Sequence, residues 1–158
     1  MSAMRAIVIY ESLTGNTKAA ATLVGDGLRT SGVVVTVCSV TAVDYQALAE
    51  ADVVVVGTWT DGYVFAGQRP GRQGRIAKLP SMAGKKAAVF CTYAVNPGKV
   101  LEKMARLLDA RGADVIGGFA IKRTDIAGGA DTLVDRLLAN VADRAASGSP
   151  AVDVGVAD

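Results

Sequence analysis

Five apolar runs rich in β-branched residues recur along this chain of 158 residues, and they restrict its fold more than any other feature. The clearest run contains Val53-Val54-Val55-Val56 with no polar residue between them. A strand that is apolar on both faces is typical of a parallel sheet covered on both sides. The runs predict five strands, at Arg5–Tyr10, Val33–Cys38, Asp52–Gly57, Lys86–Tyr93 and Asp114–Ile121.

The segments between these runs predict helices. Apolar residues recur at helical spacing in Lys18–Arg29, Pro97–Arg111 and Ala130–Ala146, and a short helix or turn fits Val43–Ala51. Asn96 is the expected N-cap of the helix that starts at Pro97. Alternation of strands and helices with right-handed crossovers predicts a doubly wound α/β fold around a five-stranded parallel sheet. Pattern alone leaves the strand order open.

A single domain is expected over residues 1–146, because the length suits one core and no repeat or composition change divides the chain. The tail 147–158 has no periodicity and is expected to be disordered. Residues 57–84 contain glycines and two prolines that interrupt most helical windows. We expect a long functional loop there, with one short helix around Arg75–Leu79.

The composition excludes several kinds of chemistry. The chain has no histidine, which rules out Ser-His-Asp and Cys-His nucleophiles, histidine acid–base catalysis and histidine-ligated zinc. Cys38 and Cys91 form no C-x-x-C pair, so we expect reduced core thiols and no metal site. A net charge of +2 argues against a nucleic-acid partner. No apolar stretch approaches the ~20 residues of a membrane span, so a cytoplasmic protein is expected.

The clearest chemical motif is Glu11-Ser12-Leu13-Thr14-Gly15-Asn16-Thr17, which joins the first strand to the first helix. In such a turn, backbone N–H groups and a helix dipole of roughly half a charge point at a bound anion. The turn has neither the lysine of a P-loop nor a G-x-G-x-x-G pattern, so it predicts a phosphate monoester held by hydrogen bonds. The alternative is that these polar residues only cap the helix.

Two further polar segments stand at the ends of other strands. Thr58-Trp59-Thr60-Asp61-Gly62 follows the third strand, and Thr92-Tyr93-Ala94-Val95-Asn96-Pro97 ends the fourth. The carboxyl ends of strands one, three and four can converge on one crevice, where ligands of open α/β sheets bind. A planar ring between Trp59 and Tyr93 would gain about 1 kcal/mol of stacking per face beyond burial.

Residues Val8 to Val24, which hold the first strand, the turn and the start of the helix, resemble the signature of flavodoxin-type FMN proteins. The resemblance covers residues 4–146 and is to the short-chain class, because the fifth strand has no long insertion. It implies a three-layer sandwich with strand order 2-1-3-4-5. It also implies FMN, with its phosphate in the turn and its ring between the other two segments. The FMN-binding residues that it implies are Ser12, Leu13, Thr14, Gly15, Asn16, Thr17, Thr58, Trp59, Thr60, Asp61, Gly62, Thr92, Tyr93 and Asn96.

The function implied by this resemblance is electron transfer between redox partner proteins, a reductase and an electron acceptor. Such transfer needs no acid, base or nucleophile from the protein. One alternative is an FMN-dependent oxidoreductase that reduces a quinone or oxidises a protoporphyrinogen-type substrate, with residues 63–78 in the substrate pocket. Another is a regulatory module that keeps the fold without the cofactor. The oligomeric state is open.

The charges of the chain depart from the family pattern, because flavodoxins are typically acidic around the flavin. Residues 58–78 hold one acid against four bases, namely Asp61 against Arg69, Arg72, Arg75 and Lys78. At ~10 Å, each charge contributes roughly 0.4 to 1.7 kcal/mol for an effective dielectric between about 80 and 20. We therefore expect a less reducing flavin than in an acidic flavodoxin. The alternatives are a solvated basic loop, or docking to an acidic partner or an anionic substrate.

Overall fold

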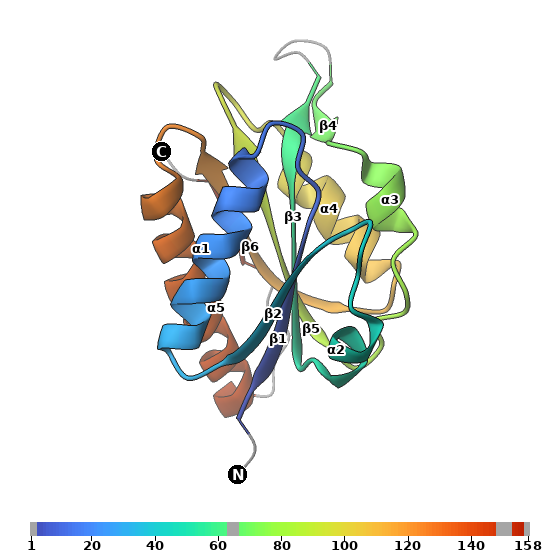
Figure 1. The fold of residues 1–158 in the computed structure, drawn as a ribbon, viewed down its shortest axis with the longest axis vertical. Helices are drawn as coiled ribbons and strands as arrows, with labels where there is room; N and C mark the ends of the chain where they lie inside the picture. Colours follow the sequence, from blue (N-terminus) through green and yellow to red (C-terminus); the bar gives the residue numbers. More distant parts are fainter. Residues whose placement is uncertain (1–2, 63–66, 148–152, 157–158) are drawn as a thin grey trace.

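The architecture is a parallel sheet between two layers of helices, as a computed structural model describes it for residues 3–62, 67–147 and 153–156 (Figure 1). The strands are β1 (Arg5–Tyr10), β2 (Val34–Ser39), β3 (Val53–Asp61), β4 (Arg69–Pro70), β5 (Lys86–Tyr93), β6 (Asp114–Lys122) and β7 (Asp153–Val156). The helices are α1 (Asn16–Thr30), α2 (Tyr45–Glu50), α3 (Gln73–Ala77), α4 (Val100–Asp109) and α5 (Ile126–Ser147).

The strand order of the main sheet is β2-β1-β3-β5-β6-β7, and neighbouring strands run parallel. The five predicted strands are all present, and their order is the 2-1-3-4-5 order implied by the family resemblance. The α/β fold prediction is therefore confirmed. The strands start or end within a few residues of the predicted positions, and β3 shows the largest difference.

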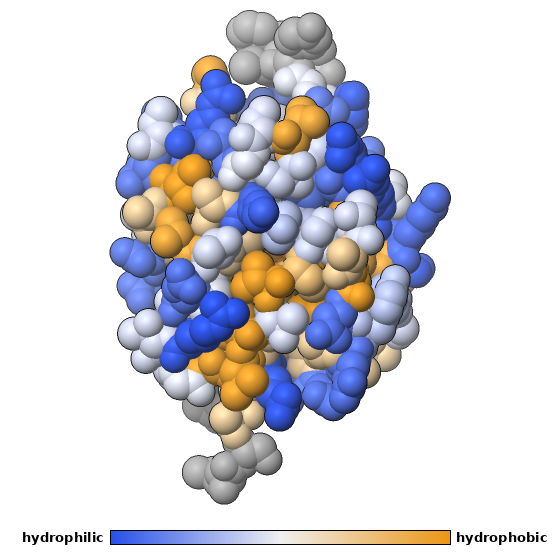
Figure 2. Space-filling view, viewed as in Figure 1, coloured by the Kyte–Doolittle hydropathy of each residue, from blue (hydrophilic) through white to orange (hydrophobic). Residues whose placement is uncertain are grey.

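The core lies on both faces of this sheet, which explains why its strands are almost continuously apolar. On one face, α1 and α5 pack against the sheet through residues such as Val24, Leu28 and Leu133. On the other face, α2, α3 and α4 cover it with residues such as Leu48, Ile76 and Met104. At the β2 edge the burial is only partial, and apolar and charged side chains alternate over the face shown in Figure 2.

Strand β3 is longer than predicted, because Thr58–Asp61 continue it instead of forming a loop. Trp59 lies opposite Thr92 of β5, so the central sheet supports this extension. Beyond it, Thr60 and Asp61 pair with Pro70 and Arg69 of the short antiparallel strand β4. Pairing with β4 and β5, and not local strand propensity, decides where this strand ends.

Residues 67–78 are more regular than the loop predicted there. They hold β4 and then α3, which begins two residues before the predicted short helix at Arg75–Leu79. Gln68 Nε2 donates a hydrogen bond to the carbonyl oxygen of Asn96, and Lys103 Nζ donates one to the carbonyl of Gln68. The described part of this segment is therefore tied to the body of the protein. Residues 63–66 lie outside the described residues.

The start of α4 and part of the tail differ from the expectation. The N-cap of α4 is Lys99 and not Asn96, because Gly98 adopts a left-handed φ of 56° that a helix starting at Pro97 cannot contain. Asn96 Oδ1 instead accepts a hydrogen bond from the Gly98 amide at 2.7 Å. In the tail, Asp153–Val156 form β7 against β6, whereas disorder was expected over 147–158. Without β7, β6 would present unpaired backbone groups at the sheet edge.

Candidate functional site

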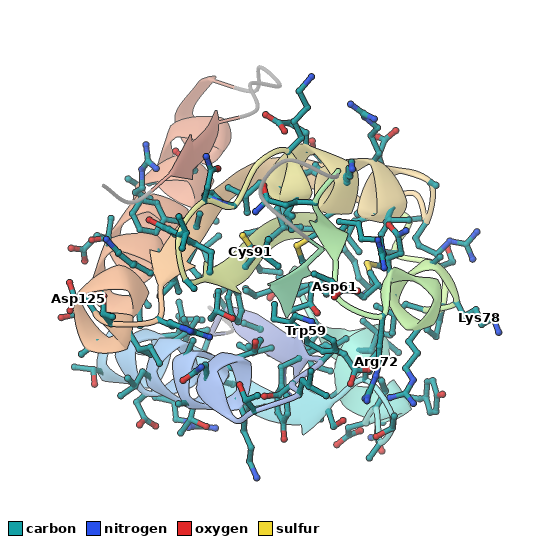
Figure 3. All side chains as sticks on the ribbon, turned by 90° about the horizontal axis from the view of Figure 1, so that it is seen from above. Trp59, Asp61, Arg72, Lys78, Cys91 and Asp125 are labelled. Atoms are coloured by element: carbon teal, nitrogen blue, oxygen red, sulfur yellow. The ribbon has the colours of Figure 1, made fainter. Side chains whose placement is uncertain are left out.

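The carboxyl ends of β1, β3, β5 and β6 meet at one edge of the sheet, the position at which open α/β sheets bind ligands. A cavity of about 280 Å³ opens there. Figure 3 looks onto this edge, with Trp59, Asp61 and Cys91 near its middle and Lys78 pointing outward at the periphery. The lining residues are Leu13, Thr14, Asn16, Trp59, Thr60, Asp61, Gly62, Thr92, Tyr93, Ala94 and Arg123.

Most of the residues implied by the family resemblance therefore lie around one cavity. Ser12, Gly15 and Thr17 do not line it, but they belong to the turn that contributes Leu13, Thr14 and Asn16. Thr58 does not line the cavity either, since its buried hydroxyl donates to the carbonyl oxygen of Gly71 at 2.8 Å. Asn96 is also outside, and its side chain is used in the turn before α4.

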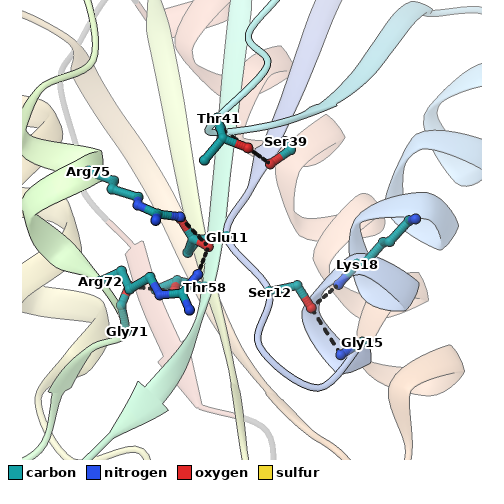
Figure 4. A network of polar contacts seen from close by, with 10 residues as sticks. All are labelled: Glu11, Ser12, Gly15, Lys18, Ser39, Thr41, Thr58, Gly71, Arg72 and Arg75. Atoms are coloured by element: carbon teal, nitrogen blue, oxygen red, sulfur yellow. Dashed lines mark hydrogen bonds and ion pairs between the residues drawn. The ribbon is translucent and has the colours of Figure 1, made fainter.

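The turn between β1 and α1 presents unused backbone donors. Within the described chain, the amides of Leu13, Thr14, Asn16 and Thr17 donate no hydrogen bond. Ser12 Oγ holds the turn by accepting hydrogen bonds from the amides of Gly15 at 3.2 Å and Lys18 at 3.3 Å, as Figure 4 shows. A run of free amides at a helix N-terminus fits an anion such as phosphate.

Gly15 and Thr17 shape this turn in different ways. Gly15 adopts a φ of 97°, and a Cβ there would find no atom within 4 Å, so its backbone conformation and not its lack of volume requires glycine. Thr17 is buried, and its Oγ1 lies 3.0 Å from Thr92 Oγ1. This hydrogen bond joins the turn to β5.

Two aromatic residues form walls of the cavity, as the prediction of a bound planar ring requires. Tyr93 is buried in the structure and Trp59 is half-buried. The Trp59 ring packs directly on Gly71, where a Cβ would come within 2.2 Å of its Cε2. The Arg72 guanidinium lies over the same ring, 5.5 Å from the centroid.

Thr60, which lines the cavity, carries a buried polar atom with little hydrogen bonding of its own. Thr60 Oγ1 is buried, and apart from the weak thiol donor of Cys91 it has no hydrogen-bond partner in the described structure. Burial raises the pKa of the Cys91 thiol to about 12, while the Thr60 hydroxyl lowers it by a smaller amount. Cys91 is therefore a protonated core thiol, as expected from the sequence.

Glu11 opens the turn motif, but the sequence analysis gave it no role of its own. Its side chain is only 4% exposed and lies between two arginines, with Arg72 Nη1 3.0 Å from Oε1 and Arg75 Nη1 3.0 Å from Oε2 (Figure 4). A charged residue directly after an apolar strand was a visible signal. Its partners were not, because they lie 61 and 64 residues further along the chain.

Arg123 is the second residue that the sequence analysis missed. It directly follows β6, so a cation at the end of the fifth strand was the available signal. Arg123 lines the cavity, and its side chain makes no hydrogen bond or ion pair within the described residues. Asp61, by contrast, is paired with Arg69 at 3.3 Å.

The remaining expectations about ligands concern metals and membranes. Over residues 3–62, 67–147 and 153–156, no cluster of three His, Cys, Asp or Glu side chains could hold a metal ion. Within the same ranges, no helix combines the length and apolar character that crossing a bilayer requires.

Fold and site together define a doubly wound α/β protein with a turn of free amides and an aromatic-walled cavity at the carboxyl edge of its sheet. The flavodoxin domain model matches residues 7–125, and the chain belongs to the flavodoxin family. Proteins of this family bind flavin, typically FMN, and transfer electrons to partner proteins. No curated protein sequence matches the chain.

Solved flavodoxin structures share this fold. Flavodoxin 2 from Bacillus cereus is 19% identical, with 85% of this chain and 98% of that chain covered at a TM-score of 0.69. A flavodoxin from the domain Archaea is 24% identical, with 85% and 99% covered at a TM-score of 0.62. The flavodoxin of Streptococcus pneumonia TIGR4 is 24% identical, with 87% and 99% covered at a TM-score of 0.64.

Proposed function

We propose that this chain is an FMN-binding electron carrier that passes electrons between a reductase and an electron acceptor. The observation that carries the proposal is the row of free amides in the turn, placed beside a cavity walled by Trp59 and Tyr93. The amides suit a phosphate monoester, and the two aromatic residues suit a planar ring. Bound FMN would supply the reversible uptake of electrons.

The protein's own residues would bind and orient the cofactor. The amides of Leu13, Thr14, Asn16 and Thr17 would donate to the phosphate, and Thr60 Oγ1 would hydrogen-bond a polar atom of the ligand. Trp59 and Tyr93 would exclude water from the ring. No proton transfer by the protein is needed, which agrees with a chain without histidine.

Titration of the purified protein with FMN and with riboflavin tests this function. Since Trp59 is the only tryptophan, we expect its fluorescence to be quenched on binding. Riboflavin lacks the phosphate and should bind at least about tenfold more weakly, because ~1.4 kcal/mol of anion contacts is lost. A Trp59→Phe variant should still bind FMN, as measured by flavin fluorescence. Equal affinity for both flavins, or no binding of either, would contradict the proposal.

The oxidoreductase alternative was expected to use residues 63–78. The described part of that segment is engaged in β4, α3 and their ion pairs, so no specific observation favours a substrate pocket in it. Steady-state turnover with NADH or NADPH and a quinone separates the two functions. A carrier should oxidise NADH or NADPH only slowly and without saturation, under conditions in which it accepts electrons from a reductase.

The expected rise in flavin potential rests on Arg123 more than on the basic segment. Arg69 is paired with Asp61, and Arg72 and Arg75 share Glu11, so their net effect is smaller than the sequence count suggested. Arg123 lines the cavity without such a partner. A cation beside a reduced, anionic ring stabilises it.

Redox titration of the FMN-loaded protein and of Arg123→Gln tests this charge effect. We expect the potential for the second electron to fall by about 20 to 70 mV in the variant, from roughly 0.4 to 1.7 kcal/mol at ~10 Å and about 59 mV per 1.4 kcal/mol. Lys86→Gln, at the opposite end of β5, is the matched control and should leave the potential unchanged. A wild-type potential as low as that of acidic flavodoxins would refute the charge effect.

A further inference from the structure

The burial of Glu11 calls for a reason, since a carboxylate is seldom taken out of water without a partner. Glu11 is the last residue before the anion-binding turn, and its amide donates to the carbonyl of Gly57 in β3 at 2.9 Å. Both of its oxygens accept from arginines of the segment after β4, at 3.0 Å from Arg72 and at 3.0 and 3.3 Å from Arg75. One buried carboxylate therefore connects β1 to α3.

Arg72 has an unusual backbone that this contact helps to explain. With φ and ψ both at 45°, it is the one non-glycine residue with a positive φ in the described chain, and it stands at the N-cap of α3. This conformation is disfavoured for a residue with a Cβ, and it persists where the surroundings hold it. Here the surroundings are the Glu11 carboxylate on one side and the Trp59 ring on the other.

Trp59 is held at several points by the same segment. The carbonyl oxygen of Trp59 accepts from the amide of Gly71 at 2.8 Å, and the Thr58 hydroxyl donates to the Gly71 carbonyl at 2.8 Å. The absence of a side chain at Gly71 lets the indole lie against the backbone. The Arg72 guanidinium then covers the ring at 5.5 Å from its centroid. The indole that lines the cavity is thus packed against Gly71 and Arg72.

From these contacts we infer that Glu11 is a positioning residue for Trp59, acting through Arg72. The carboxylate fixes the guanidinium, the guanidinium fixes the indole, and the indole forms the ring wall of the cavity. Glu11 also begins the anion-binding turn. It therefore fixes the position of this turn relative to Trp59. Arg75 is the second cation on Glu11, and among the described residues it makes no hydrogen bond or cation–π contact with Trp59. The consequence for flavin rests on the proposed function, whereas the consequence for Trp59 does not.

Trp59 fluorescence in the cofactor-free protein tests the inference directly, because the chain has one tryptophan. We expect Glu11→Gln and Arg72→Gln to increase acrylamide quenching of Trp59 at least about twofold. Arg72→Lys keeps a cation for Glu11 but lacks the planar group that stacks on the ring, so quenching should be intermediate. Arg75→Gln should have the smallest effect of the four. Arg29→Gln removes an arginine from the exposed pair with Asp26 and should change nothing.

The FMN affinity of the same variants gives the second measurement. We expect the Kd to rise about tenfold in Glu11→Gln and Arg72→Gln and less than threefold in Arg75→Gln. The double variant Glu11→Gln with Arg72→Gln should lose little more than either single one, since both act on the same contact. If Glu11→Gln does not fold, as judged by circular dichroism, the Arg72 variants still decide the question, because Glu11 then retains Arg75.

Unchanged quenching in folded Glu11→Gln and Arg72→Gln would overturn the inference. So would a weaker FMN affinity with unchanged Trp59 quenching, because Glu11 would then act only on the turn. Failure of the wild-type protein to bind FMN would refute the proposed function alone. The quenching experiment on the cofactor-free protein would still give its own result.

Discussion

Gly15→Ala is expected to weaken FMN binding by about 10- to 100-fold, or roughly 1.4 to 2.8 kcal/mol. Gly15 has a φ of 97°, where an alanine costs about 1 to 2 kcal/mol of backbone strain. The turn can relieve this strain only by rotating, and rotation moves the amides of Thr14 and Asn16 away from their common direction. Isothermal titration with FMN gives the affinity directly.

Gly32→Ala provides a matched control for that experiment. Gly32 has a φ of 87° and, like Gly15, open space around its would-be Cβ, but it lies just after α1 at the end remote from the cavity. Both variants should lose similar stability, measured by urea unfolding, and only Gly15→Ala should lose FMN affinity. Equal FMN affinities would mean that the turn does not hold the phosphate.

Gly57→Ala is expected to destabilise the protein by about 3 kcal/mol or more, at the upper end of overpacking effects. A Cβ at this position in β3 would come within 2.0 Å of Phe90 Cζ, and Phe90 is fully buried between the sheet and its helices. The ring cannot move aside in a close-packed core without displacing neighbours. Urea unfolding measures the loss of stability. A loss of this size can also prevent the variant from folding.

Gly74→Ala is the control for the Gly57 variant. Its Cβ would find nothing within 4 Å, and it lies inside α3, where alanine is favoured over glycine by about 1 kcal/mol. We therefore expect a small gain in stability there. A Gly57→Ala protein as stable as the wild type would show that Phe90 is packed more loosely than the structure has it.

The elements of the fold could be predicted from the sequence because their signals are local. Val53–Val56 need cover on both faces wherever they lie, and the apolar stripes of α1, α4 and α5 need a sheet to pack against. The family resemblance added the strand order. These signals are local, which explains why the extension of β3 and the strand β7 were not predicted. The extension of β3 to Asp61 depends on pairing with β4 and β5, and β7 depends on the open edge of β6.

The site could be predicted only in part. The turn was visible because its residues are consecutive, and Trp59 and Tyr93 because each stands at the end of a strand. Thr58 was expected to bind FMN, and in the structure its hydroxyl donates to the Gly71 carbonyl, a contact that the sequence did not indicate. Nothing in the sequence near Arg72 indicates that it contacts both Glu11 and Trp59.

By itself, then, the sequence determined a doubly wound α/β fold with a polar turn between its first strand and first helix, because periodicity and turn chemistry act over a few neighbouring residues. Only the tertiary structure decided which charged side chains at the site are paired. Of the four basic residues in 58–78, Arg69 is paired with Asp61 and Arg72 and Arg75 share Glu11, while the Arg123 side chain lines the cavity without a partner in the described chain. Electrostatic effects depend on distance and burial, which residues far apart in the chain acquire only when it folds.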